Sequence, residues 1–158
     1  MITRTRDRRQ GVTLLELVMV VTLMGILAAV GTSHFGRSAL ANFGSQGEAR
    51  TLSLSMLRGR RSAITTGDDH FIQFDAVSPA AATQYNLMRR TGGGDILVEG
   101  PHILNRDVTV VPSAIEMVFN FEGEAAAAYQ VDFVGNGRNW RLSVVPITGA
   151  VIVAEVTP

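Results

Sequence analysis

The chain has 158 residues, which is enough for one folded domain and an additional segment. Its 14 basic residues, all of them arginine, balance 14 acidic residues, so the formal net charge is zero and no overall positive field favours nucleic acid. The absence of cysteine excludes disulfide bonds, thiolate metal sites and a cysteine nucleophile.

The first eleven residues form a basic leader, with four arginines and one acid. Positive charge before an apolar segment favours a cytoplasmic amino-terminus. Removal of residues 1–11 would leave ten arginines and thirteen acids, a formal charge of −3. The remaining chain would therefore be mildly acidic, which argues against nucleic acid as a partner.

An apolar segment follows the leader. The twenty residues from Leu17 to Gly36 include no Asp, Glu, Arg or Lys. As a helix this run would be about 30 Å long, at roughly 1.5 Å per residue, which matches the hydrocarbon core of a bilayer. We therefore expect residues 12–36 to form a hydrophobic helix that lies in a membrane or in the core of a filament.

Glu16 lies at the edge of this apolar segment. A charged carboxylate there costs on the order of 2.5 kcal/mol or more, depending on its depth in the membrane. If the chain is cut after Gly11, the new α-amino group of Val12 lies one helical turn from Glu16. That amine, or the same amine of a neighbouring copy, could compensate the carboxylate.

The order of these features resembles the processing site of type IV pilins and of the pseudopilins of type II secretion. The resemblance covers the basic leader, Gly11, the sequence Thr13-Leu14-Leu15-Glu16 and the apolar run. It implies that a prepilin peptidase cuts between Gly11 and Val12 and methylates the Val12 amine, and that Glu16 pairs with this amine of an adjacent subunit. The chain departs from the usual pattern at Val12, where the family commonly has Phe, and at Ser33, where it commonly has Pro.

Two other interpretations of the amino-terminus are open. A basic region followed by an apolar region also describes a secretory signal peptide, although residues 14–30 exceed the usual apolar length of roughly 7–15 residues. A plain signal anchor that holds an extracytoplasmic β domain is the second alternative. Neither explains an acid at Glu16.

We expect the helix to continue through residues 37–66 with an amphipathic character and to end near Thr66-Gly67. The basic cluster Arg58, Arg60 and Arg61 lies near this end, where cations favour the helix dipole. The apolar residues expected to form the core-facing stripe are Phe35, Ala39, Phe43, Leu52, Met56, Leu57 and Ile64.

The apolar period falls to two in residues 67–158, which indicates a β domain. Asn136-Gly137 is a strong hairpin signal between two of the expected strands. A long helix followed by short antiparallel strands predicts an α+β, pilin-like fold in which the amphipathic half of the helix packs on the sheet. The expected strands are 71–74, 84–88, 96–98, 107–111, 115–121, 129–134, 140–145 and 150–156.

The carboxyl-terminal motifs resemble the GspH/FimT group of minor pilin-like proteins. The segment Leu57–Ile64 matches the group's helix end at Arg61 and Ser62 but lacks its Glu, and Phe119–Gly123 resembles its Phe-x-Pro-x-Gly turn with Phe121 in place of Pro. The match continues through Arg138, Arg141 and the terminal glycine Gly149.

This resemblance implies an assembly role without catalysis or a cofactor. It implies a minor pseudopilin anchored once in the bacterial inner membrane, with a cytoplasmic amino-terminus and a periplasmic β domain. Such a subunit lies at or near the tip of a periplasmic pseudopilus and helps to start it. The partners that the resemblance implies are the prepilin peptidase, other pilin or pseudopilin subunits and secreted cargo.

Two alternative functions involve particular side chains. A FimT-type minor pilin of a type IV pilus that takes up DNA would use Arg138 and Arg141 on phosphates, with Trp140 for stacking. Strand alternation places Trp140 opposite Arg141, and the acidic mature chain also argues against this use. The three histidines have no metal-ligand spacing, and calcium at the acidic residues has no specific support. These carboxylates are Asp68, Asp69, Asp95 and Glu99.

Overall fold

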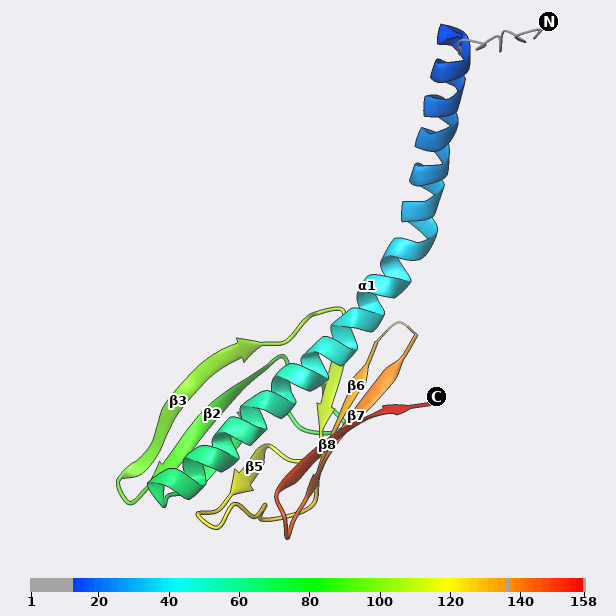
Figure 1. Ribbon diagram of the computed structural model, residues 1–158. Helices are drawn as coiled ribbons and strands as arrows, with labels where there is room; N and C mark the ends of the chain where they lie inside the picture. The colour runs from blue at the N-terminus through cyan, green and yellow to red at the C-terminus, as the bar shows by residue number, and fades with distance from the viewer. Residues whose placement is uncertain (1–12, 136, 158) are drawn as a thin grey trace, which may run out of the picture. The chain divides into compact units, whose positions relative to one another are not determined.

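The computed structural model describes residues 13–135 and 137–157, and for residues 28–43 it describes the backbone alone. Within this part of the chain, the helix α1 (Leu14–Thr66) is followed by eight strands (Figure 1). The chain separates into two compact units, Met1–Arg37 and Ser38–Pro158. The strands are β1 (His70–Phe74), β2 (Gln84–Thr91), β3 (Gly94–Ile103), β4 (Thr109–Pro112), β5 (Glu116–Phe119), β6 (Tyr129–Val134), β7 (Asn139–Val145) and β8 (Ala150–Val156).

The strands form two antiparallel four-stranded sheets in the unit Ser38–Pro158. Their orders are β3-β2-β1-β5 and β4-β6-β7-β8. An isolated antiparallel bridge between Ala82 and Val110 connects the segment before β2 to the second sheet. The carboxyl-terminal part of α1 packs on this β structure (Figure 1). The architecture confirms the predicted α+β, pilin-like fold.

Several strand boundaries differ from the predicted ones. β2 extends to Thr91 instead of ending at residue 88, and β4 covers Thr109–Pro112 instead of 107–111. β6 and β8 have the expected limits, and Val134 pairs with Asn139 where β6 leads into β7. Asn136 of the predicted hairpin turn lies outside the described residues. β5 ends at Phe119, before the expected limit, because Asn120 starts a turn in which its backbone N–H donates to Glu124 O at 3.0 Å. β3 is longer than expected because it pairs with β2 directly after the turn, from Gly94 onward.

The buried face of α1 differs from the predicted stripe. Leu52 and Met56 are fully buried as expected, but Leu57 and Ile64 are exposed. The side chains of the predicted positions 35, 39 and 43 lie outside the described residues. Small residues occupy the rest of the buried face, at Ser45, Ala49, Ser55, Gly59 and Ala63.

Gly59 shows why the buried face uses small residues. A Cβ added there would lie 2.9 Å from Cδ1 of Leu87 on β2, which is closer than the optimal carbon–carbon contact of about 3.5 Å. The helix and the first sheet therefore approach each other too closely for a larger side chain. Leu57 is larger, and it lies on the opposite side of the helix.

One hydrophobic core joins the helix to both sheets. It contains Leu52 and Met56 from α1, Tyr85 and Leu87 from the first sheet and Phe133 from the second. The Tyr85 hydroxyl reaches the helix at Ser55 Oγ, 3.2 Å away, and burial raises the pKa of this phenol. The core residues lie within the unit Ser38–Pro158, so this unit contains the packing that stabilises the β domain.

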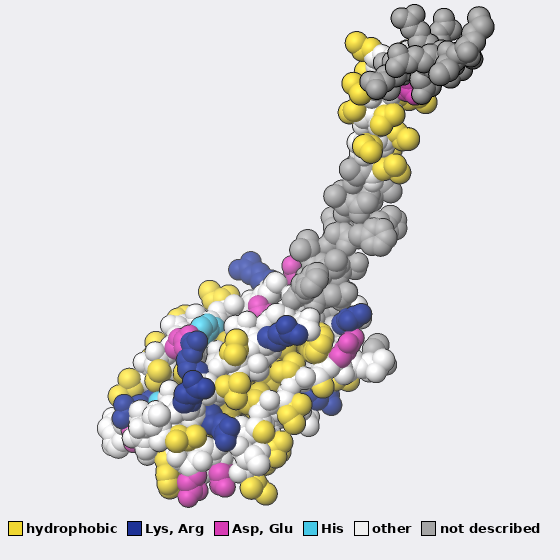
Figure 2. Space-filling view, in the orientation of Figure 1, with side chains coloured by type: hydrophobic (Ala, Val, Ile, Leu, Met, Phe, Trp, Pro, Cys, Tyr) yellow, Lys and Arg dark blue, Asp and Glu magenta, His cyan; other side chains and the backbone are white. Residues whose placement is uncertain are grey.

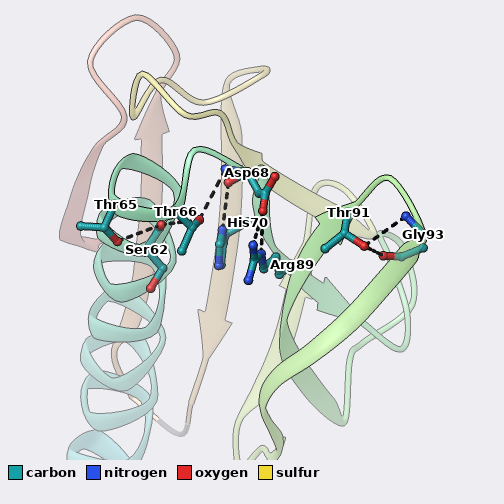
Figure 3. A network of polar contacts seen from close by, with 9 residues as sticks. Ser62, Thr65, Thr66, Asp68, His70, Arg89, Thr91 and Gly93 are labelled. Atoms are coloured by element: carbon teal, nitrogen blue, oxygen red, sulfur yellow. Dashed lines mark hydrogen bonds and ion pairs between the residues drawn. The ribbon is translucent and has the colours of Figure 1, made fainter.

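A polar network ties the end of α1 to the first sheet (Figure 3). Gly67 has φ = 77°, and its N–H donates to Ala63 O at 3.0 Å, as expected of a glycine that ends a helix. The following residue, Asp68, pairs with Arg89 on β2, and its carbonyl lies 3.0 Å from Nδ1 of the buried His70. These contacts hold β1 and β2 at the helix end.

Candidate functional site

The described part of the amino-terminal segment begins with a helix cap. Thr13 precedes α1, and its Oγ1 accepts a hydrogen bond from the Glu16 N–H at 3.3 Å, while its carbonyl accepts one from the Leu17 N–H at 3.1 Å. Thr-x-x-Glu is the pattern of a capping box, in which the acid also favours the positive end of the helix dipole. The Thr13 cap is a local role for this sequence that the sequence interpretation did not consider.

The side chains that follow Thr13 are apolar and exposed. In residues 13–27 the polar side chains are Thr13, Glu16 and Thr22. The Thr22 hydroxyl donates to the carbonyls of Val18 and Met19, at 2.9 Å each, so it needs no solvent. The exposed apolar side chains are Leu14, Leu15, Leu17, Val18, Met19, Val20, Val21, Leu23, Met24, Ile26 and Leu27.

No helix segment among the described residues meets the combined length and hydropathy expected of a membrane span.

The Glu16 side chain is exposed. Its carboxylate has no ion-pair or hydrogen-bond partner within the described residues. Because its surroundings are apolar, covering this surface with lipid or protein would leave a charge that needs a cation. Gly11 and Val12, the predicted cleavage and methylation residues, lie outside the described residues.

The basic cluster near the end of α1 makes specific contacts with the β domain. The Arg58 Nη1 donates to both oxygens of Glu99, at 2.7 and 2.6 Å, and this guanidinium lowers the pKa of that carboxyl. The Arg60 Nε donates to Gly123 O at 2.8 Å. The last turn of α1 contains no basic residue. The cluster therefore lies before the last turn, and its two contacting members, Arg58 and Arg60, position β3 and the turn after β5.

Two glycines from the carboxyl-terminal motifs meet beside Arg60. A Cβ added at Gly149 would lie 2.1 Å from Gly123 O and 2.8 Å from Arg60 Nε. Both glycines have positive φ, 82° at Gly123 and 58° at Gly149. The turn after β5 and the turn between β7 and β8 therefore contact each other and the helix. We call this contact of Gly123, Gly149 and Arg60 the glycine joint. Sequence reasoning singled out both glycines but could not show that they touch.

The two arginines considered for nucleic-acid contact are engaged with carboxylates. Arg141 makes a two-point contact with Asp132, at 2.6 and 3.1 Å, and this contact raises the pKa of the Arg141 guanidinium. Arg138 lies 3.5 Å from Glu155. Trp140 packs against the hydrophobic core. Trp140 is thus half-buried, and both arginines face carboxylates.

Three of the four acidic residues considered for calcium pair with arginines. Asp68 pairs with Arg89, Asp95 with Arg90, and Glu99 with Arg58. Across the residues that the structure describes, no three His, Asp or Glu side chains are grouped as a metal site would require.

The chain combines a pilin-like fold with a prepilin-type methylation motif at its amino-terminus. The family described as the prokaryotic N-terminal methylation motif matches residues 6–32, which include Gly11, Val12 and Glu16. No curated protein matches the sequence.

Solved structures support the same class. The minor pseudopilin EpsH of the type 2 secretion system of Vibrio cholerae aligns with a TM-score of 0.58 at 14% identity, covering 70% of this chain and 96% of that chain. The type IV minor pilin FimU of Pseudomonas aeruginosa aligns with a TM-score of 0.53 at 17% identity, covering 69% of this chain and 91% of that chain. At these identities the similarity establishes the pilin-like fold.

Proposed function

We propose that the chain is a minor pseudopilin of a type II secretion system, made as a precursor, cut between Gly11 and Val12 and methylated at Val12. The processed subunit is anchored in the inner membrane by residues 12–36, with the β domain of residues 67–158 in the periplasm. It is assembled at or near the tip of a pseudopilus, where it helps initiation and contacts cargo. The methylation motif over residues 6–32 and the EpsH-like fold support this proposal.

The observation that carries the proposal is Glu16 in its apolar setting. Its carboxylate, which has no partner among the described residues, lies among exposed Leu, Val and Met side chains. A neighbouring subunit inserted at the correct height would supply the Val12 amine, while any other height would leave the carboxylate without a cation. Glu16 therefore sets the axial position of the subunit, and the apolar side chains supply most of the binding free energy.

The experiment for processing is the amino-terminal sequence and intact mass of the protein extracted from its native membranes. The expected chain begins at N-methylated Val12. Replacement of Gly11 by Arg should leave the precursor uncut, because a bulky charged residue replaces the glycine before the scissile bond. A chain that begins at Met1 or near Thr32 would refute the proposal in favour of a signal anchor or a secretory signal.

The experiment for assembly separates the charge of Glu16 from its position in the helix cap. Glu16→Gln keeps a side chain that suits the capping box but removes the charge, whereas Glu16→Val removes both. Both variants should be processed, but neither should co-purify with the other pseudopilin subunits from native membranes, whereas the unmodified chain should. A control, Thr13→Ser, retains the capping hydroxyl and should assemble normally. Normal incorporation of Glu16→Gln would show that the charge has no assembly role.

A minor pilin of a type IV pilus is the second candidate function. The FimU alignment, with a TM-score of 0.53, favours it almost as well as the EpsH alignment, with 0.58, favours a pseudopilin. Deletion of the gene in its host distinguishes them. Loss of secreted proteins with intact surface pili supports the pseudopilin, and loss of pili with intact secretion supports the pilin.

A further inference from the structure

An exposed apolar surface continues from α1 onto the two turns of the glycine joint. Ile64 lies directly beneath Gly123, since a Cβ added at Gly123 would be 2.7 Å from Ile64 Cδ1. The turn of Gly123 also carries Phe121, and the adjoining turn of Gly149 carries Ile147. We call Leu57, Ile64, Phe121 and Ile147 the apolar stripe; their exposed fractions are 42%, 50%, 57% and 79%.

Opposite charges border the apolar stripe. On the helix side, Arg61 lies one turn from Leu57 and projects from the exposed face of α1. On the turn side, Glu122 is exposed next to Phe121. Neither side chain has an ion-pair partner in the described part of the chain. Figure 2 shows apolar and arginine side chains together over the helix and acidic side chains at the lower end of the same face.

This surface is different from ordinary scattered exposure of apolar residues. Its four members lie on adjoining elements, and one of them is an exposed phenylalanine, a residue type that is enriched at protein interfaces. Phe121 also occupies the position at which the resembled turn has a proline. The stripe is held rigidly, because the Arg60 Nε donates to Gly123 O at 2.8 Å and the Ala125 N–H donates to Pro146 O at 2.8 Å.

We propose that the apolar stripe is the contact surface for a second copy of this chain, related by a two-fold axis parallel to α1. Such an axis places the stripe of one copy on the stripe of the other. It also brings the Arg61 side of each stripe against the Glu122 side of the other. Arg61 of each copy then faces Glu122 of the other, which gives two equivalent ion pairs at the rim. A two-fold axis perpendicular to the helix would instead place like charges together.

The charge pattern therefore also determines the direction of the two chains. The two copies of the helix segment 38–66 run parallel in this dimer. This direction suits two subunits anchored in one membrane, and in that respect the inference rests on the proposed function. The contact is otherwise independent of Glu16 and concerns the β-domain unit, Ser38–Pro158.

Cysteine cross-linking in native membranes tests the contact, because the full-length chain has no cysteine of its own. Ile64→Cys lies near the proposed axis and should form a homodimer with a short bis-maleimide. Leu97→Cys, equally exposed but on β3, is the matched control and should remain monomeric. An Ile64→Cys product that is monomeric, or that contains a different protein, would overturn the inference.

Charge exchange tests the direction of the contact on the Ile64→Cys background. Arg61→Glu and Glu122→Arg should each reduce homodimer yield by about tenfold, since each acts at two symmetry-related pairs. Coexpression of the two variants should restore a mixed dimer, which a folding defect could not do. Arg106→Glu, an exposed residue outside the stripe, should have no effect. Failure of the mixed dimer to recover would refute the Arg61–Glu122 pairing.

The mass of the same extracted protein separates this inference from the proposed function. A chain that begins at methylated Val12 but does not cross-link refutes the dimer and leaves the pseudopilin proposal intact. A chain that cross-links but begins at Met1 supports the dimer and refutes the pseudopilin proposal.

Discussion

Gly149→Ala is expected to destabilise the β domain strongly. The added Cβ would lie 2.1 Å from Gly123 O, where the optimal contact is about 3.5 Å, so one turn must move by more than 1 Å. An alanine at φ = 58° costs about 1 kcal/mol through its backbone conformation alone. Displacing Gly123 O from the Arg60 guanidinium adds about 2 kcal/mol, as expected for a hydrogen bond to a charged group.

The total loss is therefore about 3 kcal/mol in the free energy of unfolding. For a unit of this size, this corresponds to a fall of about 12 °C in the unfolding midpoint. Circular dichroism of the purified full-length chain in detergent, recorded during heating, measures the change.

Gly67→Ala is the matched control for Gly149→Ala. Gly67 also has a positive φ, 77°, but a Cβ added there meets no atom within 4 Å. We expect a loss of about 1 kcal/mol, or about 4 °C, from backbone conformation alone. If the two variants unfold at the same temperature, the close contact between the two turns does not limit residue 149, and the reasoning on the glycine joint is wrong.

Two further substitutions test the helix. Gly47→Ala should raise stability by about 0.8–1 kcal/mol, because Gly47 is exposed inside α1 with no atom within 4 Å of the added Cβ; an unchanged or lower midpoint on thermal unfolding would contradict this. Burial raises the pKa of Glu48 above 4.5, although the Asn105 N–H that donates to it opposes the shift. The neutral carboxyl, which suits the buried site, is therefore present below pH 4.5 and is lost as the pH rises. Glu48→Gln should stabilise the fold by less than about 1 kcal/mol at pH 7.5, where it replaces a charged group. It should have no effect at pH 3.5, where it replaces a neutral one. Equal midpoint shifts at the two pH values would exclude this cause.

The exposed ion pairs have a smaller expected part in stability. Arg141 and Asp132 lie directly opposite each other on β6 and β7, and both are substantially exposed. Exposed pairs of this kind contribute roughly 0–1 kcal/mol because solvent screens them. The pair has a further consequence for function. The Arg141 guanidinium is bound to Asp132, whereas the nucleic-acid alternative would need it free to bind phosphate.

The amino-acid sequence by itself determined the features that depend on short-range order. Gly11, Val12 and Glu16 were predicted as processing and assembly residues from their positions between a basic leader and an apolar run, and the methylation motif covers that segment. The strand pattern was also local, because alternation of apolar and polar residues reflects the two faces of each strand. The helix end at Gly67 followed from glycine's tolerance of a positive φ.

Only the tertiary structure decided which surfaces meet. The helix buries Ala49, Gly59 and Ala63 and exposes Leu57, because its close approach to β2 leaves no room for large side chains. A hydropathy pattern ranks residues by their transfer from water and contains no information on the distance between two elements. The contact of Arg60 with Gly123 and Gly149 likewise joins segments far apart in the chain, and so depends on how helix and sheets pack.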